Sequence, residues 1–134
     1  MSGGADTPDV VDVIIVDDSA DLRDLIGTVL RTVGTGFRVV GEAGDGEEAV
    51  ALARRTRPGL VLLDIAMPVM DGIQALPHIR EAAPEAVVVM LSGFGASTAG
   101  KAARDAGAHG YLEKEDLART LVPRVRRIID TVRS

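Results

Sequence analysis

The sequence predicts an α/β fold in which five parallel strands alternate with five helices, a (βα)5 doubly wound arrangement. Short apolar runs of strand length recur along the chain. Between them lie segments whose apolar residues repeat every three or four positions, as on one face of a helix. The runs at 60–63 and 86–91 contain apolar residues only, which is typical of strands covered on both faces. Short strand–helix units of this kind form a parallel five-stranded sheet with helices on both sides.

Capping and turn residues set the limits of the expected elements. Ser19 and Asp71 are suited to be N-caps, because their side chains can accept a hydrogen bond from the first turn of a helix. Pro58-Gly59 is typical of the end of a helix. We therefore expect strands at 11–16, 37–43, 60–64, 86–91 and 110–113, and helices at about 20–33, 45–57, 72–83, 96–106 and 116–132.

The apolar residues of three helices predict which face packs on the sheet. In the first helix they are Leu22, Leu25, Ile26, Val29, Leu30 and Val33. In the last helix they are Leu117, Leu121, Val125, Ile128 and Val132. The fourth helix has only alanines on this face, namely Ala99, Ala102, Ala103 and Ala106. Because a buried methyl group stabilises less than a buried leucine, we expect the fourth helix to be the most weakly held.

Composition limits the classes of function. Residues 1–9 are small and polar and predict a flexible tail, and residues 10–134 predict one domain. The net charge of -5 argues against electrostatic binding of nucleic acid, and the absence of cysteine excludes disulfides and thiolate chemistry. His78 and His109 have no ligand partner at useful spacing, so we expect both at the surface. No apolar run is long enough for a membrane span and no signal peptide is present, so we expect a cytoplasmic protein without a membrane partner.

Polar side chains end four of the five expected strands. Asp17 and Asp18 follow the first strand, Asp64 ends the third, Ser92 follows the fourth, and Lys114 follows the fifth. The carboxyl ends of parallel strands share one edge, where open α/β sheets bind ligands. Three neighbouring carboxylates repel one another unless a cation lies among them, and Mg²⁺ suits oxygen ligands. With a lysine and a hydroxyl beside them, these residues indicate a site where Asp64 receives a phosphoryl group.

Each of these residues also has a simpler explanation. Asp64 could cap a turn, and Asp17 and Asp18 could form a solvated N-cap pair. Ser92 could cap its loop, and Lys114 could be an ordinary surface lysine. The conjunction favours a site, because these independent explanations would all have to hold at once.

Four motifs resemble those of the response regulator receiver domain of two-component signalling, the family of the chemotaxis protein CheY. They are VDDS at 16–19, DIAMPVMDG at 64–72, LSG at 91–93 and GAHGYLEK at 107–114. The resemblance extends from residue 11 to about residue 132. It implies a sheet with strand order 2-1-3-4-5.

The resemblance also implies the roles of the site residues. Asp64 would be the phosphoacceptor, and Lys114 would pair with the phosphoryl group. Asp18, Asp64 and the backbone carbonyl of Ala66 would ligate Mg²⁺ directly, and Asp17 would act partly through water. The donor would be a sensor histidine kinase or a phosphotransfer protein. The chain would not be an enzyme beyond catalysing its own phosphorylation and dephosphorylation.

Signalling would follow from movement near the site. The resemblance implies that Ser92 moves to hydrogen-bond the phosphoryl group and that Tyr111 swings inward in response. The fourth helix, the fifth strand and the fifth helix would then bind an unidentified output protein. The weak anchoring expected of the fourth helix agrees with such a switch.

Three departures from the family pattern concern the site and the partner face. Glu115 follows the lysine where relatives often have proline, as in the NarL-like subgroup. Ala66 and Phe94 stand where relatives often have polar side chains that position the hydrolytic water. Pro123 lies inside the last helix, where it should bend the helix or delay its regular start.

Several readings remain beside a stand-alone receiver. The chain could be the receiver portion of a truncated DNA-binding response regulator, or a receiver-like module that binds its partner without phosphorylation. A phosphatase of the haloacid dehalogenase type also uses a strand-end aspartate with Mg²⁺. That class needs a second aspartate two residues after the nucleophile, where this chain has Ala66.

Overall fold

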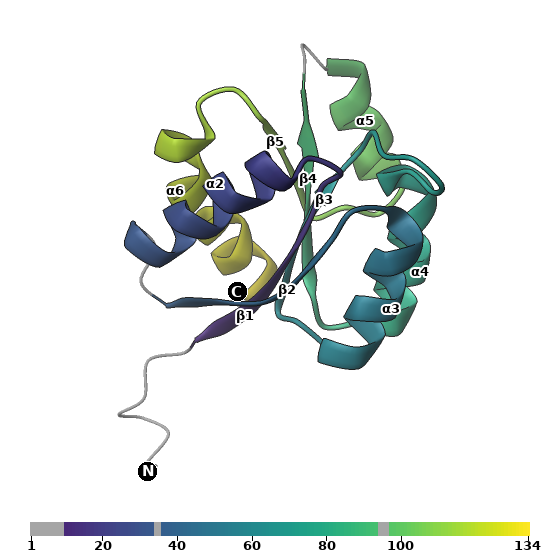
Figure 1. Ribbon diagram of the computed structural model, residues 1–134, viewed down its shortest axis with the longest axis horizontal. Helices are drawn as coiled ribbons and strands as arrows, with labels where there is room; N and C mark the ends of the chain where they lie inside the picture. Colours follow the sequence, from purple (N-terminus) through teal and green to yellow (C-terminus); the bar gives the residue numbers. More distant parts are fainter. Residues whose placement is uncertain (1–9, 34–35, 94–96) are drawn as a thin grey trace.

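Five strands and five helices alternate in the computed structural model, which describes residues 10–33, 36–93 and 97–134 (Figure 1). The strands are β1 (Val11–Val16), β2 (Phe37–Ala43), β3 (Leu60–Asp64), β4 (Val87–Ser92) and β5 (Gly110–Glu113). The helices are α2 (Ala20–Thr32), α3 (Gly46–Thr56), α4 (Gly72–Ala82), α5 (Ser97–Asp105) and α6 (Leu117–Arg133). The flexible tail expected at 1–9 lies outside the described residues.

All strands of the sheet are parallel, and their order is β2-β1-β3-β4-β5, as predicted. At the centre, Leu62 of β3 pairs with Ile15 of β1 on one side and with Val89 of β4 on the other. The carboxyl ends of β1 and β3 are therefore neighbours, and β4 separates β3 from β5. This order brings the ends of β1, β3, β4 and β5 to one edge of the sheet.

Helices cover both faces of the sheet, so its central strands are buried on both sides (Figure 1). On one face, Ile15, Leu62 and Val89 pack against α2 and α6. On the other face, the intervening residues, such as Ile14 and Val61, pack against α3, α4 and α5. Every residue of β3 is buried, which explains why its sequence has no polar position before Asp64.

Side-chain caps begin three of the helices near the site. Ser19 accepts the backbone N–H of Leu22 at the start of α2, and Asp71 forms a capping box at the start of α4. Both caps were predicted. Asp45 caps α3 in the same way by accepting the N–H of Glu48. Each cap therefore stabilises the first turn of a helix and the loop that joins it to the carboxyl end of the preceding strand.

Parts of the predicted helix faces are wrong. Leu25 and Val33 are exposed, because Leu25 lies at the border of the apolar stripe and Val33 follows the last residue of α2, Thr32. In α6 the buried residue near the carboxyl end is Ile129, whereas Val132 is exposed. A helical stripe predicts a direction, but its edges depend on how far the sheet extends beneath it.

The face of α5 also differs from the prediction. Ala103 is buried and Ala106 is half-buried, but Ala102 is exposed, and Gly100 takes the other buried position. The side chain of Ala99 lies outside the described part of the chain. Because the residue one step from Ala103 turns about 100° away, Ala102 faces solvent. The buried residues of α5 are small, in keeping with weak anchoring of this helix.

Candidate functional site

A lysine and two buried aspartates meet at the carboxyl edge of the sheet. Asp17 follows β1 and Asp64 ends β3, and their exposed fractions are only 0% and 2%. The Nζ atom of Lys114, which follows β5, lies 2.8 Å from Oδ2 of Asp17 and 3.0 Å from Oδ1 of Asp64. The predicted convergence of these three residues is thus present in the structure.

Asp18 completes an acidic group that is suited to a divalent cation. Asp17, Asp18 and Asp64 each offer a carboxylate oxygen, and these oxygens lie within 4.8 Å of one another. The carboxylate of Asp18 is exposed, unlike the other two. Oδ2 of Asp64 is buried, and no residue in the described ranges donates a hydrogen bond to it. A buried anionic oxygen without a donor fits coordination by a hard cation such as Mg²⁺.

Burial governs the ionisation of the site. It raises the pKa of Asp64 to about 6; the negative charge of Asp17 adds to the increase, and Lys114 opposes it. Burial by itself lowers the pKa of Lys114, but hydrogen bonding and attraction to Asp17 and Asp64 outweigh it, so the pKa of Lys114 is raised. Lys114 therefore stays charged, and Asp64 carries a negative charge that the protein compensates only in part.

The loop after β3 is hydrogen-bonded to the neighbouring strand β4 and to the carboxylate of Asp64. Ile65 donates its N–H to the carbonyl oxygen of Leu91 at 3.0 Å, and Ala66 donates its N–H to Oδ1 of Asp64 at 3.3 Å. Gly72 donates to the carbonyl oxygen of Ile65 at 2.8 Å, and a Cβ at Gly72 would collide with the carbonyl of Asp64. The loop therefore folds back closely and holds the carboxylate of Asp64 in place.

The site opens to solvent through a cavity of about 380 Å³. Its lining residues are Asp18, Asp64, Ile65, Ala66, Ser92, Gly93 and Lys114. The backbone N–H of Lys114 donates to the carbonyl oxygen of Ser92 at 2.7 Å, so the ends of β4 and β5 are joined here. Of the predicted site residues, Asp18, Asp64, Ala66, Ser92 and Lys114 thus share one solvent-accessible cavity, whereas Asp17 is fully buried and Tyr111 lies outside it.

Comparison with known proteins identifies the family. The model of the response regulator receiver domain matches residues 13–126. The chain belongs to this family. It is a CheY-like receiver domain of two-component signalling, and Asp17, Asp18 and Asp64 form the acidic pocket that fits its phosphorylation site.

Curated relatives include longer and shorter proteins. The transcriptional regulatory protein PdtaR of Mycobacterium tuberculosis is 39% identical over 123 residues, which cover 90% of this chain and 58% of PdtaR. The chain therefore spans little more than half of that relative. The chemotaxis protein CheY of Bacillus subtilis is 40% identical over 102 residues, which cover 76% of this chain and 83% of CheY.

Solved structures agree with the fold. The receiver domain of the putative response regulator NarL from Mycobacterium tuberculosis has a TM-score of 0.83 and 30% identity over 92% of this chain and 98% of its own. The CheX–CheY complex with BeF3 and Mg from Borrelia burgdorferi contains a chain with a TM-score of 0.78 and 31% identity. That match covers 92% of this chain and 90% of the other. The predicted likeness to NarL-type receivers is confirmed.

Tyr111 of the receiver lies on β5 next to α5. Its hydroxyl oxygen is buried, and within the described ranges it has no hydrogen-bond partner. The ring lies against Gly100, since a Cβ at that glycine would be 3.6 Å from the ring. The ring is therefore within van der Waals distance of the backbone of α5 at this glycine.

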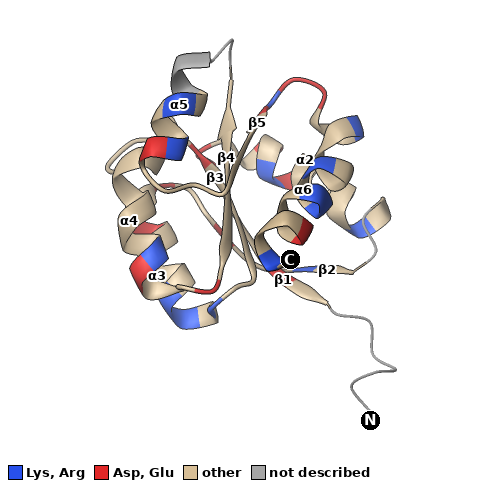
Figure 2. Cartoon of the chain, turned by 180° about the vertical axis from the view of Figure 1, so that it is seen from behind, with Lys and Arg blue, Asp and Glu red and all other residues tan. Residues whose placement is uncertain are grey.

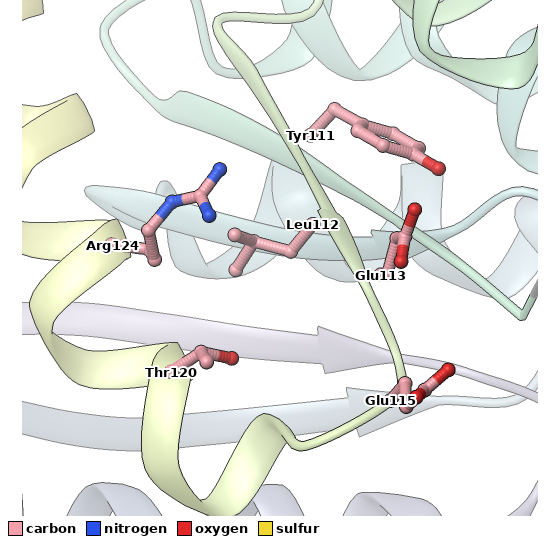
Figure 3. A pocket seen from close by; sticks show the side chains of 6 residues that line it. All are labelled: Tyr111, Leu112, Glu113, Glu115, Thr120 and Arg124. Atoms are coloured by element: carbon pink, nitrogen blue, oxygen red, sulfur yellow. The ribbon is translucent and has the colours of Figure 1, made fainter. Parts of the chain in front are cut away.

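A second cavity, of about 340 Å³, lies between β5 and α6 of the receiver (Figure 3). It is lined by Tyr111, Leu112, Glu113, Glu115, Thr120 and Arg124. In the view of Figure 3, Arg124 and Thr120 come from α6, and the two glutamates come from the end of β5 and the loop beyond it. Figure 2 shows acidic residues in this loop and basic residues along α6. Glu115, which departs from the family pattern, thus lines the same cavity as Tyr111.

The other departures have different outcomes. The helix α6 begins at Leu117 and continues through Pro123, so the proline does not delay the start of the helix. Ala66 lines the cavity beside Asp18 and Asp64. Phe94 lies outside the described residues.

In the described part of the chain, no helix combines the length and apolar character needed to cross a membrane.

Two polar residues near the sheet were not assigned their contacts from the sequence. Arg23 of α2 donates to the carbonyl oxygen of Asp17, although only the acidic residues of this loop were singled out. His109 is half-buried rather than a surface residue, and its Nδ1 atom accepts the N–H of Val88 at 2.9 Å. Burial, followed by the charge of Arg80, lowers the pKa of His109. His78 is exposed, as predicted.

Proposed function

We propose that Asp64 accepts a phosphoryl group from a sensor histidine kinase or a phosphotransfer protein. Asp18, Asp64 and the backbone carbonyl of Ala66 would hold Mg²⁺ directly, and Asp17 would act partly through water. The observation that carries this proposal is the buried carboxylate of Asp64, which is paired with Lys114 on one oxygen and lacks a donor from the described residues on the other. The unpaired oxygen fits a metal ligand, and the charge fits a nucleophile.

The chemistry follows from these positions. A carboxylate oxygen of Asp64 forms a bond to phosphorus as the bond between phosphorus and the donor breaks, and the electron pair leaves with the donor. Bound Mg²⁺ would supply positive charge to the phosphoryl oxygens. Lys114 keeps its proton and pairs with the negative oxygens that arrive at the site. The N–H of Ala66 holds the acceptor carboxylate in orientation.

The proposed output uses the face formed by α5, β5 and α6. Ser92 would turn toward the phosphoryl group, and Tyr111 would swing inward toward the space it leaves. The unpaired hydroxyl of Tyr111 and the small buried residues of α5 support this proposal, because little binding energy opposes the movement of either. The face would bind an unidentified output protein, and we expect this binding to occur in the cytoplasm.

A second arrangement is favoured by the length of PdtaR, of which the chain covers 58%. The same receiver would then be the regulatory portion of a longer response regulator, and a DNA-binding regulator is the form that we expected from the sequence. Phosphorylation of Asp64 is the same in both arrangements. They differ in whether the output face binds a separate protein or another domain of one polypeptide.

The proposal is tested by incubating the chain with Mg²⁺ and acetyl phosphate and measuring its intact mass. We expect one added phosphoryl group in the wild type and none in Asp64→Asn, with Asp130→Asn as a control for an exposed carboxylate of α6. Removal of Mg²⁺ with a chelator should abolish the addition. A wild type that stays unmodified would favour the module that binds its partner without phosphorylation.

A further inference from the structure

The carboxylate of Asp18 is positioned by its backbone. It is exposed, and within the described ranges it forms no hydrogen bond or ion pair, unlike Asp17 and Asp64. Its distance from the other two carboxylates therefore depends on how the peptide between Asp17 and Asp18 is oriented. A peptide group is planar, so fixing the carbonyl oxygen of Asp17 also fixes the N–H of Asp18 and the direction of its Cα.

Arg23 holds that carbonyl oxygen. Its Nη1 atom donates to the carbonyl of Asp17, and its Nε atom donates to Oε1 of Glu42 at 3.0 Å. The side chain of Arg23 is only 20% exposed. Because Glu42 lies on β2 and Arg23 on α2, the guanidinium joins three elements around the acidic loop. A guanidinium can make both contacts at once, since its donors form a rigid fork.

The other polar atoms of Asp17 are held by different groups. Its N–H donates to the carbonyl of Ala43 at 3.0 Å, and its Oδ1 accepts the N–H of Ser19 at 2.8 Å. Its Oδ2 lies next to Lys114. Among the described residues, Arg23 is thus the side chain that holds the backbone carbonyl group through which Asp17 is bonded to Asp18.

We propose that Arg23 is a positioning residue for the divalent cation, which it never touches. This inference rests on the proposed function, because it assumes that Mg²⁺ binds at Asp18 and Asp64. Positioning and charge predict opposite effects of removing the guanidinium. Loss of a nearby positive charge alone would strengthen cation binding, whereas loss of the hold on Asp17 allows Asp18 to move and weakens it.

The test is isothermal titration of the full chain with Mg²⁺. We expect Arg23→Met to weaken the affinity about tenfold, in the range found for groups that orient metal ligands. Arg38→Met is the matched control, because Arg38 also bridges β2 to β1, through an ion pair of 2.7 Å with Asp12, at the opposite end of the strands. The Arg38→Met variant should bind Mg²⁺ with the affinity of the wild type.

Three results would overturn the inference. The first is an unchanged or tighter affinity in Arg23→Met, and the second is an equal loss in Arg38→Met. Arg23→Lys is a second variant in case Arg23→Met does not fold, because it keeps the positive charge at this position. Its single ammonium cannot bridge Asp17 and Glu42 as a fork does, so weaker binding is expected, and wild-type affinity would contradict the inference. A wild type that binds no Mg²⁺ would instead refute the proposed function, and the inference with it.

Discussion

The Nζ atom of Lys114 lies 3.0 Å from Oδ1 of Asp64, although β4 stands between the strands that end at these two residues. The lysine reaches across the edge of the sheet and also contacts Asp17. It therefore joins the first, third and fifth strands of the receiver at one point. The pair also explains how a carboxylate that is buried at the end of an apolar strand can remain reactive at neutral pH.

Lys114→Met tests the value of this bridge. Without the ammonium, two buried carboxylates face each other uncompensated, so in the absence of Mg²⁺ we expect a loss of about 1–3 kcal/mol in the free energy of unfolding, allowing for partial solvent exposure. Urea denaturation measures it. Phosphorylation by acetyl phosphate should slow at least about tenfold. Lys101→Met, which breaks an exposed ion pair with Asp105, should change neither the free energy of unfolding nor the rate of phosphorylation. An equal effect of Lys101→Met would contradict the role given to Lys114.

Asp64→Asn should stabilise the receiver when Mg²⁺ is absent. The pKa of Asp64 is raised to about 6. Folding therefore favours the protonated form, so the destabilisation grows as the pH rises from the unfolded value of about 4 to about 6 and is complete above it. We expect a gain of roughly 1–2 kcal/mol at pH 7.5, measured by urea denaturation, and a much smaller gain at about pH 4.5, where the wild type is protonated too. Equal gains at both pH values would contradict this account.

His109 makes stability depend on pH in the opposite sense. Its pKa is lowered, chiefly by burial, so the fold favours the neutral imidazole. The stability it contributes is complete above the unfolded value of about 6.5 and is lost as the pH falls through the lower folded value. His109→Asn keeps an acceptor for the N–H of Val88 but cannot titrate.

The measurement is the difference in free energy of unfolding between His109→Asn and the wild type. Relative to the wild type, the variant should become more stable between about pH 7.5 and pH 5. Taking the difference removes the contribution of Asp64, which both proteins share. His78→Asn, at an exposed position, should show no such trend. A flat difference for His109→Asn would show that its burial has no energetic consequence.

Val69 is a strained residue in the loop after β3. It has φ of 68° and is 75% exposed, and the N–H of Met70 donates back to the carbonyl of Pro68 around it. A β-branched residue is disfavoured in this conformation, so Val69→Gly should raise the free energy of unfolding by about 0.5–1 kcal/mol. Val33→Gly, at an exposed valine with φ of -100°, should give no gain. A lower melting temperature for Val69→Gly would contradict this explanation.

Slow hydrolysis of the phosphoryl group is expected, because Ala66 gives the cavity no polar side chain for orienting water. Ala66→Asn and Phe94→Glu should each speed dephosphorylation, measured as the loss of added mass after the donor is removed. Unchanged rates in both variants would contradict this explanation. Asp130→Asn on α6 provides the control rate.

The position of Asp64 at the edge of the sheet was predictable from a short local pattern, and the strand order was predictable from the family resemblance. A strand that is apolar to its last residue predicts burial on two faces, and the position of Asp64 after such a run places it at the edge. The family motifs then supplied the strand order that brings Asp17 and Lys114 to the same edge. No side-chain contact had to be known for these steps.

The contacts of Arg23 and His109 were not predictable in this way. Arg23 meets the carbonyl of Asp17 only because α2 packs beside β1 and β2, and His109 replaces a backbone acceptor only because its loop lies against Val88. Both contacts depend on tertiary packing rather than on sequence spacing. For the same reason Leu25 was wrongly expected to be buried, since the extent of the sheet beneath α2 decides where the edge of its apolar stripe lies.

The central claim, that Asp64 is the phosphoryl acceptor, is tested most directly by locating the modified residue. An acyl phosphate can be reduced with borohydride after treatment with acetyl phosphate and Mg²⁺, which converts the modified aspartate to homoserine, and tandem mass spectrometry identifies its position. Homoserine should appear at position 64 alone. Homoserine at Asp17 or Asp18, with Asp64 unchanged, would contradict the account.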